Sequence, residues 1–302
     1  MSKNNQNFGK LFLVGFPVTD RCNLTCPHCL SRINGNLKKS PDMEPHIAEY
    51  LASEIAGRVE YINLSAGYGE TYLNKNISRI LDVFHHHGIK TITYTNGSDA
   101  SREGILNSYT DILLISIDEY HSSCDTIFFD RQCSLINDIS ITGERSIAEK
   151  IVLTCALDSK YFCPEYIGAI AILCDKYPFL SAEFHWRMEY CHDNAKKGCT
   201  GQVIESYIGY FNMIDKGKIT PPPFLHYPDN QCSDIFRSLY FDSQGNLRKC
   251  CIFPDTITGL NIFQQSLEEI LNAPQLEAIR KYWKENNGYS FCRKCPIGFG
   301  IV

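Results

Sequence analysis

The chain has 302 residues, which is enough for one large domain with an appendage or for two domains. Its hydrophobic content of 44%, charged content of 21% and net charge of −5 are ordinary for a globular protein and give no reason to expect a nucleic-acid or anionic-membrane partner. Fifteen cysteines are the exception, and in a chain of this size without an export signal they indicate metal or redox chemistry rather than disulfides.

Short apolar runs alternate with segments of helical spacing over the first part of the chain. Residues 11–18 are predicted as a strand and not as a signal peptide, because the run is short, contains Pro17 and lacks a small-residue cleavage site. Further strands are predicted at 59–66, 89–95, 111–118, 150–157 and 181–188, with helices at 44–57, 76–88, 101–109 and 164–177. This alternation predicts an α/β fold of parallel βα units, in which ligands bind at the carboxyl ends of the strands. No apolar run reaches membrane-spanning length, so the protein is expected in the cytoplasm.

The alternation of short apolar runs and helical segments ends after residue 190. A helix is predicted at 202–215, followed by a proline-rich connector. The sequence SLYFDSQGNLRKC then predicts a β-hairpin around a Gln-Gly-Asn turn, and the segment from Ser266, a plausible N-cap, is helical with a break near Pro274. These changes divide the chain into a first domain at 1–190, a linker with a helix at 191–230, and a carboxyl-terminal domain at 231–302.

Three cysteines follow the first predicted strand directly. The sequence TDRCNLTCPHC places Cys22, Cys26 and Cys29 in one loop with the spacing C-x3-C-x2-C. Three thiolates in one loop can hold three irons of a cubane [4Fe–4S] cluster and leave the fourth iron open to another ligand. A zinc loop and a chance spacing are the alternatives.

This cysteine loop resembles that of the radical S-adenosylmethionine (radical SAM) enzymes. In that family the same spacing follows the first strand of a partial (β/α)6 TIM barrel, and the residue before the third cysteine is of aromatic type, a place that His28 fills here. The resemblance covers roughly residues 10–190. It implies that SAM chelates the open iron and is cleaved to a 5′-deoxyadenosyl radical, which removes a hydrogen atom from the substrate.

The sequence SAGYGET after the second strand is similar to the glycine-rich SAM-binding turn of these enzymes. Gly67 and Gly69 would let the backbone approach the ligand, and Glu70 would accept a hydrogen bond from the ammonium group of SAM. Thr71 stands where the family usually has proline, a departure that we expect the turn to tolerate.

Other residues at strand ends are candidates for SAM or substrate binding. Asn96 in TNG follows the third strand and Ser116 in SID follows the fourth, and both match positions that commonly contact SAM in the family. His185, Arg187 and Glu189 alternate on the sixth strand and therefore share one face. Arg187 is the best candidate of the three, because a buried arginine needs an anionic partner.

A second group of cysteines lies in the carboxyl-terminal domain. Cys232, Gly245 and Cys250 have the spacing C-x12-G-x4-C, and Cys292 and Cys295 follow as C-x2-C. The combined pattern resembles the SPASM extension of radical SAM enzymes or its shortened form, called twitch, which the small number of residues after the last pair favours. The resemblance implies that these four thiolates hold one auxiliary [4Fe–4S] cluster, with a zinc site as the structural alternative.

Cys251 stands directly beside the predicted ligand Cys250 and points to the opposite face of an extended segment. Its place is similar to that of the donor thiol in radical SAM epimerases of ribosomal peptides and aminoglycosides. This similarity implies that Cys251 returns a hydrogen atom to a substrate radical. Adjacent cysteines are also expected from the composition alone, so an inert Cys251 remains the alternative.

The motifs described above are compatible with several functions. Epimerisation of an aminoglycoside, sugar or peptide natural product is preferred, with a flavodoxin or ferredoxin as electron donor and neither nucleic acid nor membrane as partner. The first alternative is dehydrogenation of an alcohol, with the auxiliary cluster as electron acceptor, as in the similar enzyme of the butirosin pathway. Peptide crosslinking is a further alternative, weakened by the absence of a leader-binding domain before the first strand, and a zinc-stapled scaffold without enzymatic activity is the last.

The other cysteines are predicted to be core residues, because free cysteine packs as a small hydrophobic side chain. They are Cys124, Cys133, Cys155, Cys163, Cys174, Cys191 and Cys199.

Overall fold

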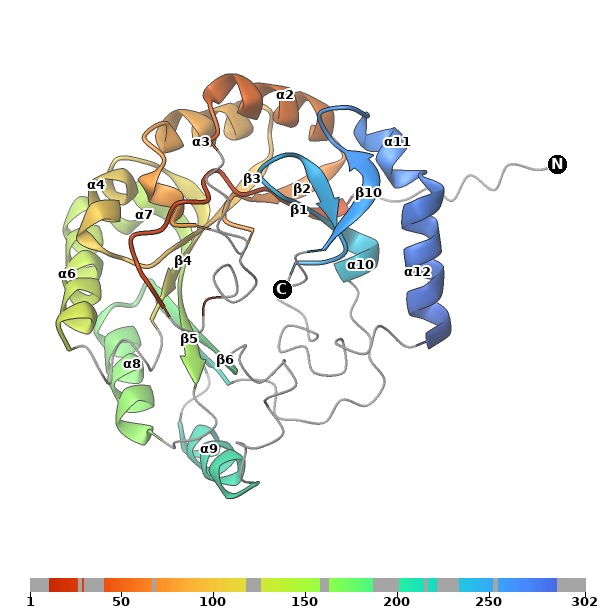
Figure 1. Cartoon of the computed structure of the whole chain (residues 1–302). Helices are drawn as coiled ribbons and strands as arrows, with labels where there is room; N and C mark the ends of the chain where they lie inside the picture. Colours follow the sequence, from red (N-terminus) through yellow and green to blue (C-terminus); the bar gives the residue numbers. More distant parts are fainter. Residues whose placement is uncertain are drawn as a thin grey trace.

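The computed structural model describes residues 11–26, 29, 41–66, 69–117, 126–157, 163–186, 201–214, 217–221, 234–251 and 255–286. A curved sheet forms the inner wall of the molecule, and helices surround it (Figure 1). The first domain supplies six parallel strands that lie side by side in chain order. They are β1 (Leu11–Gly15), β2 (Val59–Asn63), β3 (Lys90–Thr95), β4 (Thr110–Ser116), β5 (Ala148–Leu157) and β6 (Leu180–Trp186). The predicted partial barrel is confirmed.

The helices of the first domain cover the outer face of this sheet (Figure 1). They are α2 (Pro45–Ile55), α3 (Ile77–His86), α4 (Asp99–Leu106), α6 (Thr126–Thr142), α7 (Glu144–Ile147) and α8 (Pro164–Lys176), and the predicted linker adds α9 (Gly201–Met213). The spacing of their apolar residues explains the packing: in α3, Ile77, Ile80, Leu81 and Phe84 are buried on one face. None of the helices described here is long and apolar enough to cross a membrane.

Apolar side chains fill both faces of the sheet, which explains why the strands read as nearly continuous apolar runs. A large core lies between the strands and the helices and includes Val14, Ile62, Leu113 and Phe184. A smaller cluster, here called the interior cluster, consists of five buried residues from the inner face. These are Leu13, Ile92, Leu114, Val152 and Tyr240, with Phe12, Tyr61, Tyr94, Ile112 and Cys251 packed against them.

The carboxyl-terminal segment extends the barrel sheet instead of forming a separate one. Its strand β8 (Ser238–Phe241) pairs parallel with β1, and β9 (Asn246–Arg248) and β10 (Thr256–Asn261) follow antiparallel. With β7 (Ile219–Thr220) beside β6, the described residues form one sheet of ten strands. The predicted hairpin is therefore confirmed, whereas β7 and β10 were not predicted: β7 has only two residues, and β10 reads TITGLN, with a glycine that interrupts the apolar pattern. The predicted boundary at 230/231 lies outside the described residues and stays a prediction.

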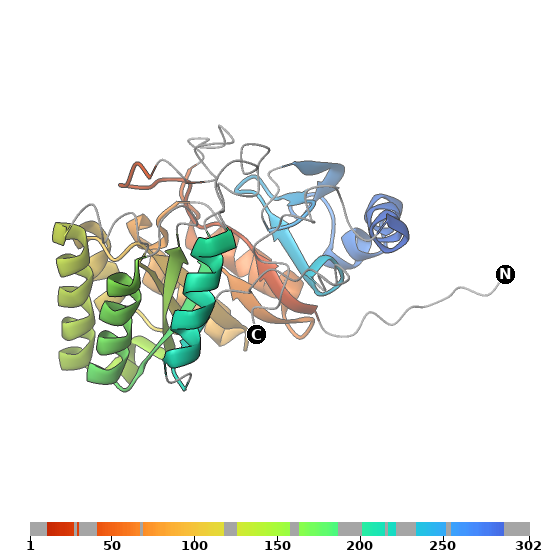
Figure 2. The same ribbon diagram turned by 90° about the horizontal axis from the view of Figure 1, so that it is seen from below.

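Three helices accompany this hairpin. They are α10 (Asp234–Arg237), α11 (Leu267–Leu271) and α12 (Pro274–Asn286). The predicted cap is confirmed, because the Ser266 hydroxyl accepts from the Glu269 amide while the Glu269 carboxylate accepts from the Ser266 amide. The break near Pro274 is also confirmed, since α12 begins at this residue. Both views place α11 and α12 on the side of the molecule away from α6 and α8 (Figures 1 and 2).

Candidate functional site

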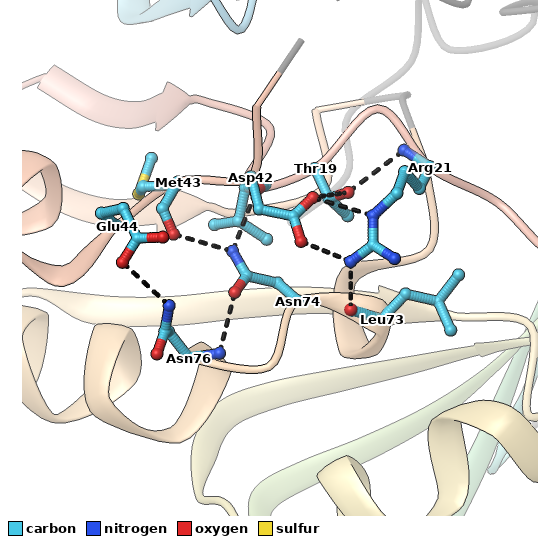
Figure 3. Close-up of polar contacts among 9 residues, drawn as sticks. Thr19, Arg21, Asp42, Met43, Glu44, Leu73, Asn74 and Asn76 are labelled. Atoms are coloured by element: carbon cyan, nitrogen blue, oxygen red, sulfur yellow. Dashed lines mark hydrogen bonds and ion pairs between the residues drawn. The ribbon is translucent and has the colours of Figure 1, made fainter. Parts of the chain in front are cut away.

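The loop that carries Cys22, Cys26 and Cys29 leaves the carboxyl end of β1 and returns at α2. Its two stems, which are the segments at Val18 and Met43 where the loop begins and ends, are joined directly. The Met43 amide donates to the Val18 carbonyl over 2.9 Å. The buried Asn74 side chain ties the same stems by donating to the carbonyls of Val18, at 2.9 Å, and Met43, at 3.0 Å (Figure 3). The loop therefore starts and ends at one fixed point on the sheet, whatever its cysteines bind.

Arg21 holds the chain immediately before Cys22. Its Nε donates to Asp42 Oδ1 over 3.0 Å and its Nη2 donates to the Leu73 carbonyl over 2.6 Å (Figure 3). The Thr19 hydroxyl donates to the same Asp42 oxygen over 2.7 Å. Because Arg21 is half exposed, these contacts position the loop more than they stabilise the fold.

The donor set of the loop fits the predicted cluster chemically. Cys22 is exposed and Cys26 and Cys29 are half-buried, so none of the three residues is enclosed in the core. The Cys29 amide donates to the Cys26 carbonyl over 3.2 Å, which holds these two residues close together. Within the part of the chain that the structure describes, no three cysteine, histidine or acidic side chains are already gathered as a metal site.

The glycine-rich turn packs against the backbone of this loop. Gly69 has φ +62°, and a Cβ atom at this position would lie 2.2 Å from the Thr19 carbonyl oxygen. The next amide, that of Glu70, donates to the Arg21 carbonyl over 2.7 Å. Only glycine combines this backbone conformation with so close an approach. The described contact is with the cysteine loop itself, so the turn and the loop form one unit.

Glu70 connects the glycine-rich turn with the end of β3. Its carboxylate is 2% exposed and accepts from the Thr95 hydroxyl over 2.8 Å and from the Asn96 amide over 2.7 Å. Burial raises the pKa of this carboxyl, and the hydrogen bonds from Asn96 and Thr95 oppose that shift. The carboxylate thus orients the turn and the TNG segment toward each other, while its predicted contact with the SAM ammonium stays a prediction.

Asn96 lies next to the cysteine loop. Its Nδ2 donates to Asn23 Oδ1 over 2.9 Å and is 3.9 Å from Cys22 Sγ. The Asn23 side chain in turn donates to the Ser98 hydroxyl over 2.7 Å. The carboxyl ends of β1, β2 and β3 therefore meet, as expected for parallel strands.

Gln132 on α6 is a site residue that sequence reasoning missed. It is fully buried, and its Nε2 donates to the Asn96 carbonyl over 3.2 Å and to the Ser116 carbonyl. The amide thereby joins the ends of β3 and β4, the two segments on which SAM contacts are predicted. A signal was present, since Gln132 shares helical spacing with the buried residues Leu135, Ile136 and Ile139 and so occupies an inward position.

Polar side chains also occur on the inner face of β6. Phe184 packs in the outer core, so by alternation Glu183 and His185 face the barrel interior. His185 Nε2 and Lys150 Nζ each lie 4.0 Å from a carboxylate oxygen of Glu183, the limit of an ion pair. Burial raises the pKa of Glu183, which the nearby Lys150 charge opposes, and burial lowers the pKa of His185. Glu183 was missed although a signal was present, since the alternation that groups His185, Arg187 and Glu189 includes it.

The two adjacent cysteines follow β9 and are both half-buried. Cys251 packs against the interior cluster, on the inner side of the barrel sheet. Cys155 and Cys174 are buried, which confirms them as core residues, and Cys133 and Cys163 pack against the core. Several predicted residues lie outside the described part of the chain. These are His28, Gly67, Arg187, Glu189, Cys124, Cys191, Cys199, Cys232, Cys292 and Cys295.

Replacing Glu70 by glutamine is expected to weaken SAM binding about tenfold, because an NH2 group would oppose the Thr95 or Asn96 donor and leave a buried group unsatisfied. Iron content should not change, since Glu70 is not a predicted cluster ligand. Equilibrium dialysis with labelled SAM measures the affinity, and Glu60→Gln, an exposed carboxylate on β2, is the matched control. Wild-type affinity in Glu70→Gln would show that this carboxylate does not organise the SAM site.

Comparison with known proteins finds similarity in both parts of the chain. The family model of the SPASM domain, an iron–sulfur cluster-binding domain, matches residues 232–296. The protein AlbA of Bacillus subtilis (strain 168), described as an antilisterial bacteriocin subtilosin biosynthesis protein, is 22% identical over 301 residues. That alignment covers 93% of this chain and 64% of AlbA, so the chain spans less than two thirds of this relative's length.

Solved structures share the fold over almost the whole chain. Streptococcus suis SuiB bound to precursor peptide SuiA has a TM-score of 0.67 at 15% identity, covering 96% of this chain and 72% of SuiB. The structure of anSMEcpe with bound AdoMet (SAM) has a TM-score of 0.59 at 14% identity, covering 95% of this chain and 88% of that chain. The motifs and the domain match bear out the predicted cofactors, SAM with its [4Fe–4S] cluster and an auxiliary [4Fe–4S] cluster. The family match places an iron–sulfur cluster-binding SPASM domain at residues 232–296, and the cysteine loop and the barrel before it indicate a chain similar to radical SAM proteins with a SPASM/twitch-type domain.

Proposed function

We propose that the protein is a radical SAM enzyme that epimerises a natural product, with Cys251 as the hydrogen-atom donor. The observation that carries this proposal is the place of Cys251, which packs against the interior cluster while its neighbour Cys250 follows the predicted ligand spacing. A thiol that contacts the inner face of the barrel lies on the side where a substrate enclosed by the barrel would be reached.

The chain supplies two sets of thiol ligands in this proposal. One set holds the cluster that binds SAM and the other holds the auxiliary cluster. The first set is Cys22, Cys26 and Cys29, and the second is Cys232, Cys250, Cys292 and Cys295. When bound, SAM and its cluster supply a 5′-deoxyadenosyl radical that removes a hydrogen atom from the substrate.

The other residues bind and orient. The unit formed by the glycine-rich turn, Glu70 and Asn96 places SAM beside the cysteine loop, because hydrogen bonds join all three elements. His28, Gly67, Ser116 and Arg187 complete the proposed SAM and substrate contacts. Cys251 then gives its S–H hydrogen to the substrate carbon, and one electron and one proton restore the thiol. A flavodoxin or ferredoxin in the cytoplasm is the proposed source of electrons.

A peptide is the preferred substrate among the natural products considered. AlbA is named for the biosynthesis of a bacteriocin, and the SuiB structure contains a precursor peptide. The inner face of the barrel sheet would suit a peptide substrate with both apolar and polar side chains. It combines the interior cluster with the polar residues Glu183 and His185.

A second candidate is oxidative modification or crosslinking of a peptide, in which no hydrogen returns to the substrate; the names of the two relatives are equally compatible with it. Dehydrogenation of an alcohol belongs to the same oxidative class. The mass of the product separates these reactions. An epimer has the mass of the substrate, whereas a dehydrogenated or crosslinked product is lighter by two hydrogens.

The reconstituted enzyme is therefore expected to convert its substrate in D₂O into a product that is one mass unit heavier and inverted at one carbon. A thiol exchanges its hydrogen with solvent and a carbon-bound hydrogen does not, so the deuterium reports the donor. Mass spectrometry of the product and of 5′-deoxyadenosine, with substrate candidates drawn from ribosomal peptides, checks this result. A product that lacks deuterium and is two mass units lighter than the substrate would contradict epimerisation and favour oxidative modification or crosslinking.

A further inference from the structure

Arg248 is an arginine with an unusual place in this fold. It is the last residue of β9 and is only 4% exposed. The hairpin of β8 and β9 leads to the predicted ligand Cys250 and is here called the auxiliary-cluster hairpin. The Nη1 of Arg248 donates to the Ala66 carbonyl over 3.1 Å, across 182 positions of sequence. A buried guanidinium needs acceptors that are placed for it, and here one of them is the backbone at the start of the glycine-rich turn.

Both backbone polar groups of Ala66 form hydrogen bonds. Its amide donates to Asn63 Oδ1 over 3.0 Å, and its carbonyl accepts from Arg248. Its φ is +40°, a conformation that residues other than glycine rarely adopt, and it is the one such non-glycine residue in the described part of the chain. A residue in this conformation persists when its surroundings determine it, and Arg248 is part of those surroundings.

The same hairpin also contacts the segments on either side of the turn. The Ser243 hydroxyl donates to Asp20 Oδ2 over 2.8 Å, two residues before Cys22. The Tyr240 ring lies against Gly15, where a Cβ atom would be 2.4 Å from Tyr240 Cδ1. The hairpin therefore touches the end of β1, the start of the cysteine loop and the glycine-rich turn.

We propose that Arg248 is a positioning residue through which the auxiliary-cluster hairpin sets the geometry of the SAM-binding turn. The inference rests on the proposed function, because it assumes that SAM binds at this turn. It goes beyond that proposal because SAM affinity would then depend on the carboxyl-terminal domain as well as on the first domain. The chain passes from Arg248 to Cys250 and Cys251 within three residues, so a shift at the auxiliary site moves the group that holds Ala66.

Arg248→Met tests this coupling, because it keeps the length of the side chain and removes its donors. SAM affinity is expected to fall about tenfold, while the chain still incorporates roughly eight irons, as for two [4Fe–4S] clusters. Arg248→Lys should give an intermediate affinity, since lysine retains the charge but not the planar fork. Arg145→Met, an exposed arginine on α7, is the matched control and should behave as wild type.

Two readouts distinguish positioning from a loss of folding. Hydrogen exchange of the protein without SAM should rise in peptides covering 64–73 in Arg248→Met and stay unchanged in helices on the far side, such as α8. The EPR spectrum of the reduced SAM-binding cluster should respond less to added SAM in the variant than in wild type.

Wild-type affinity and wild-type exchange at 64–73 in Arg248→Met would overturn the inference and leave the proposed function intact. If that variant does not fold, Arg248→Lys decides, and wild-type values there would overturn it equally. Failure of the wild-type protein itself to bind SAM would remove the proposed function, and the inference with it.

Discussion

Replacing Cys22, Cys26 and Cys29 together by alanine is expected to abolish SAM cleavage and to remove about half of the iron, because these thiols are the predicted ligands of one of two [4Fe–4S] clusters. The barrel should still fold. Its cysteine loop is anchored by Asn74 and Arg21, whose hydrogen bonds go to backbone carbonyls and to Asp42 and not to the thiols.

Iron and sulfide analysis of the anaerobically reconstituted variant measures the first effect, and chromatography of 5′-deoxyadenosine measures the second. The double variant Cys133→Ala and Cys163→Ala is the control, since both residues are half-buried cysteines that pack against the core. It should retain all of the iron and the full rate of SAM cleavage. Undiminished cleavage in the triple variant would mean that the radical cluster is held elsewhere, and zinc in place of iron in the wild type would favour the alternative metal.

Cys251→Ala is expected to lose the inverted product while SAM cleavage continues. Both clusters should remain, because Cys250 and not Cys251 has the ligand spacing. The substrate radical would then form without a donor at the interior cluster, where the Cys251 thiol packs in the wild type. Inverted product should fall to background while 5′-deoxyadenosine accumulates, and both are measured in the same reaction by mass spectrometry.

Two further variants make this test specific. Cys251→Ser keeps the size and polarity of the side chain but replaces the S–H bond by a stronger O–H bond, so it should also fail to donate. Cys250→Ala should instead lose the iron of the auxiliary cluster, which separates a ligand from a donor at adjacent positions. An oxidised product formed equally well by wild type and Cys251→Ala would exclude the donor role and favour the dehydrogenation or crosslinking candidate.

Much of the fold is readable from local pattern. The six strands and most helices of the barrel could be predicted because each is a short apolar run or an apolar face at helical spacing, and such patterns act within a few residues. The cysteine loop was also recognisable, since Cys22, Cys26 and Cys29 lie within eight residues and need no tertiary contact to be seen together. Strand ends are less well defined: β1 ends at Gly15, before the predicted residue 18, because the chain leaves the sheet to form the loop.

Residues that connect distant segments escaped prediction. Gln132 joins the ends of β3 and β4 from a helix, and Glu183 faces the interior from the middle of an apolar strand. No spacing rule relates Gln132 to Asn96 and Ser116, or Glu183 to Lys150, because these partners are neighbours only after the sheet has formed. Glu70 shows the same limit, since its motif was recognised but its bonds to Thr95 and Asn96 were not.

The sequence by itself determined the parallel βα order, the cysteine ligands to be tested and the resemblance to radical SAM enzymes, because these depend on residue types at fixed local spacing. The tertiary structure alone decided that the carboxyl-terminal hairpin joins the barrel sheet through β8 and β1, and that Arg248 reaches Ala66. It also decided that Cys251 packs on the inner face of the barrel. The physical reason is that strand pairing and the burial of a charged side chain join segments far apart in the chain, and a linear sequence does not specify which surfaces will meet.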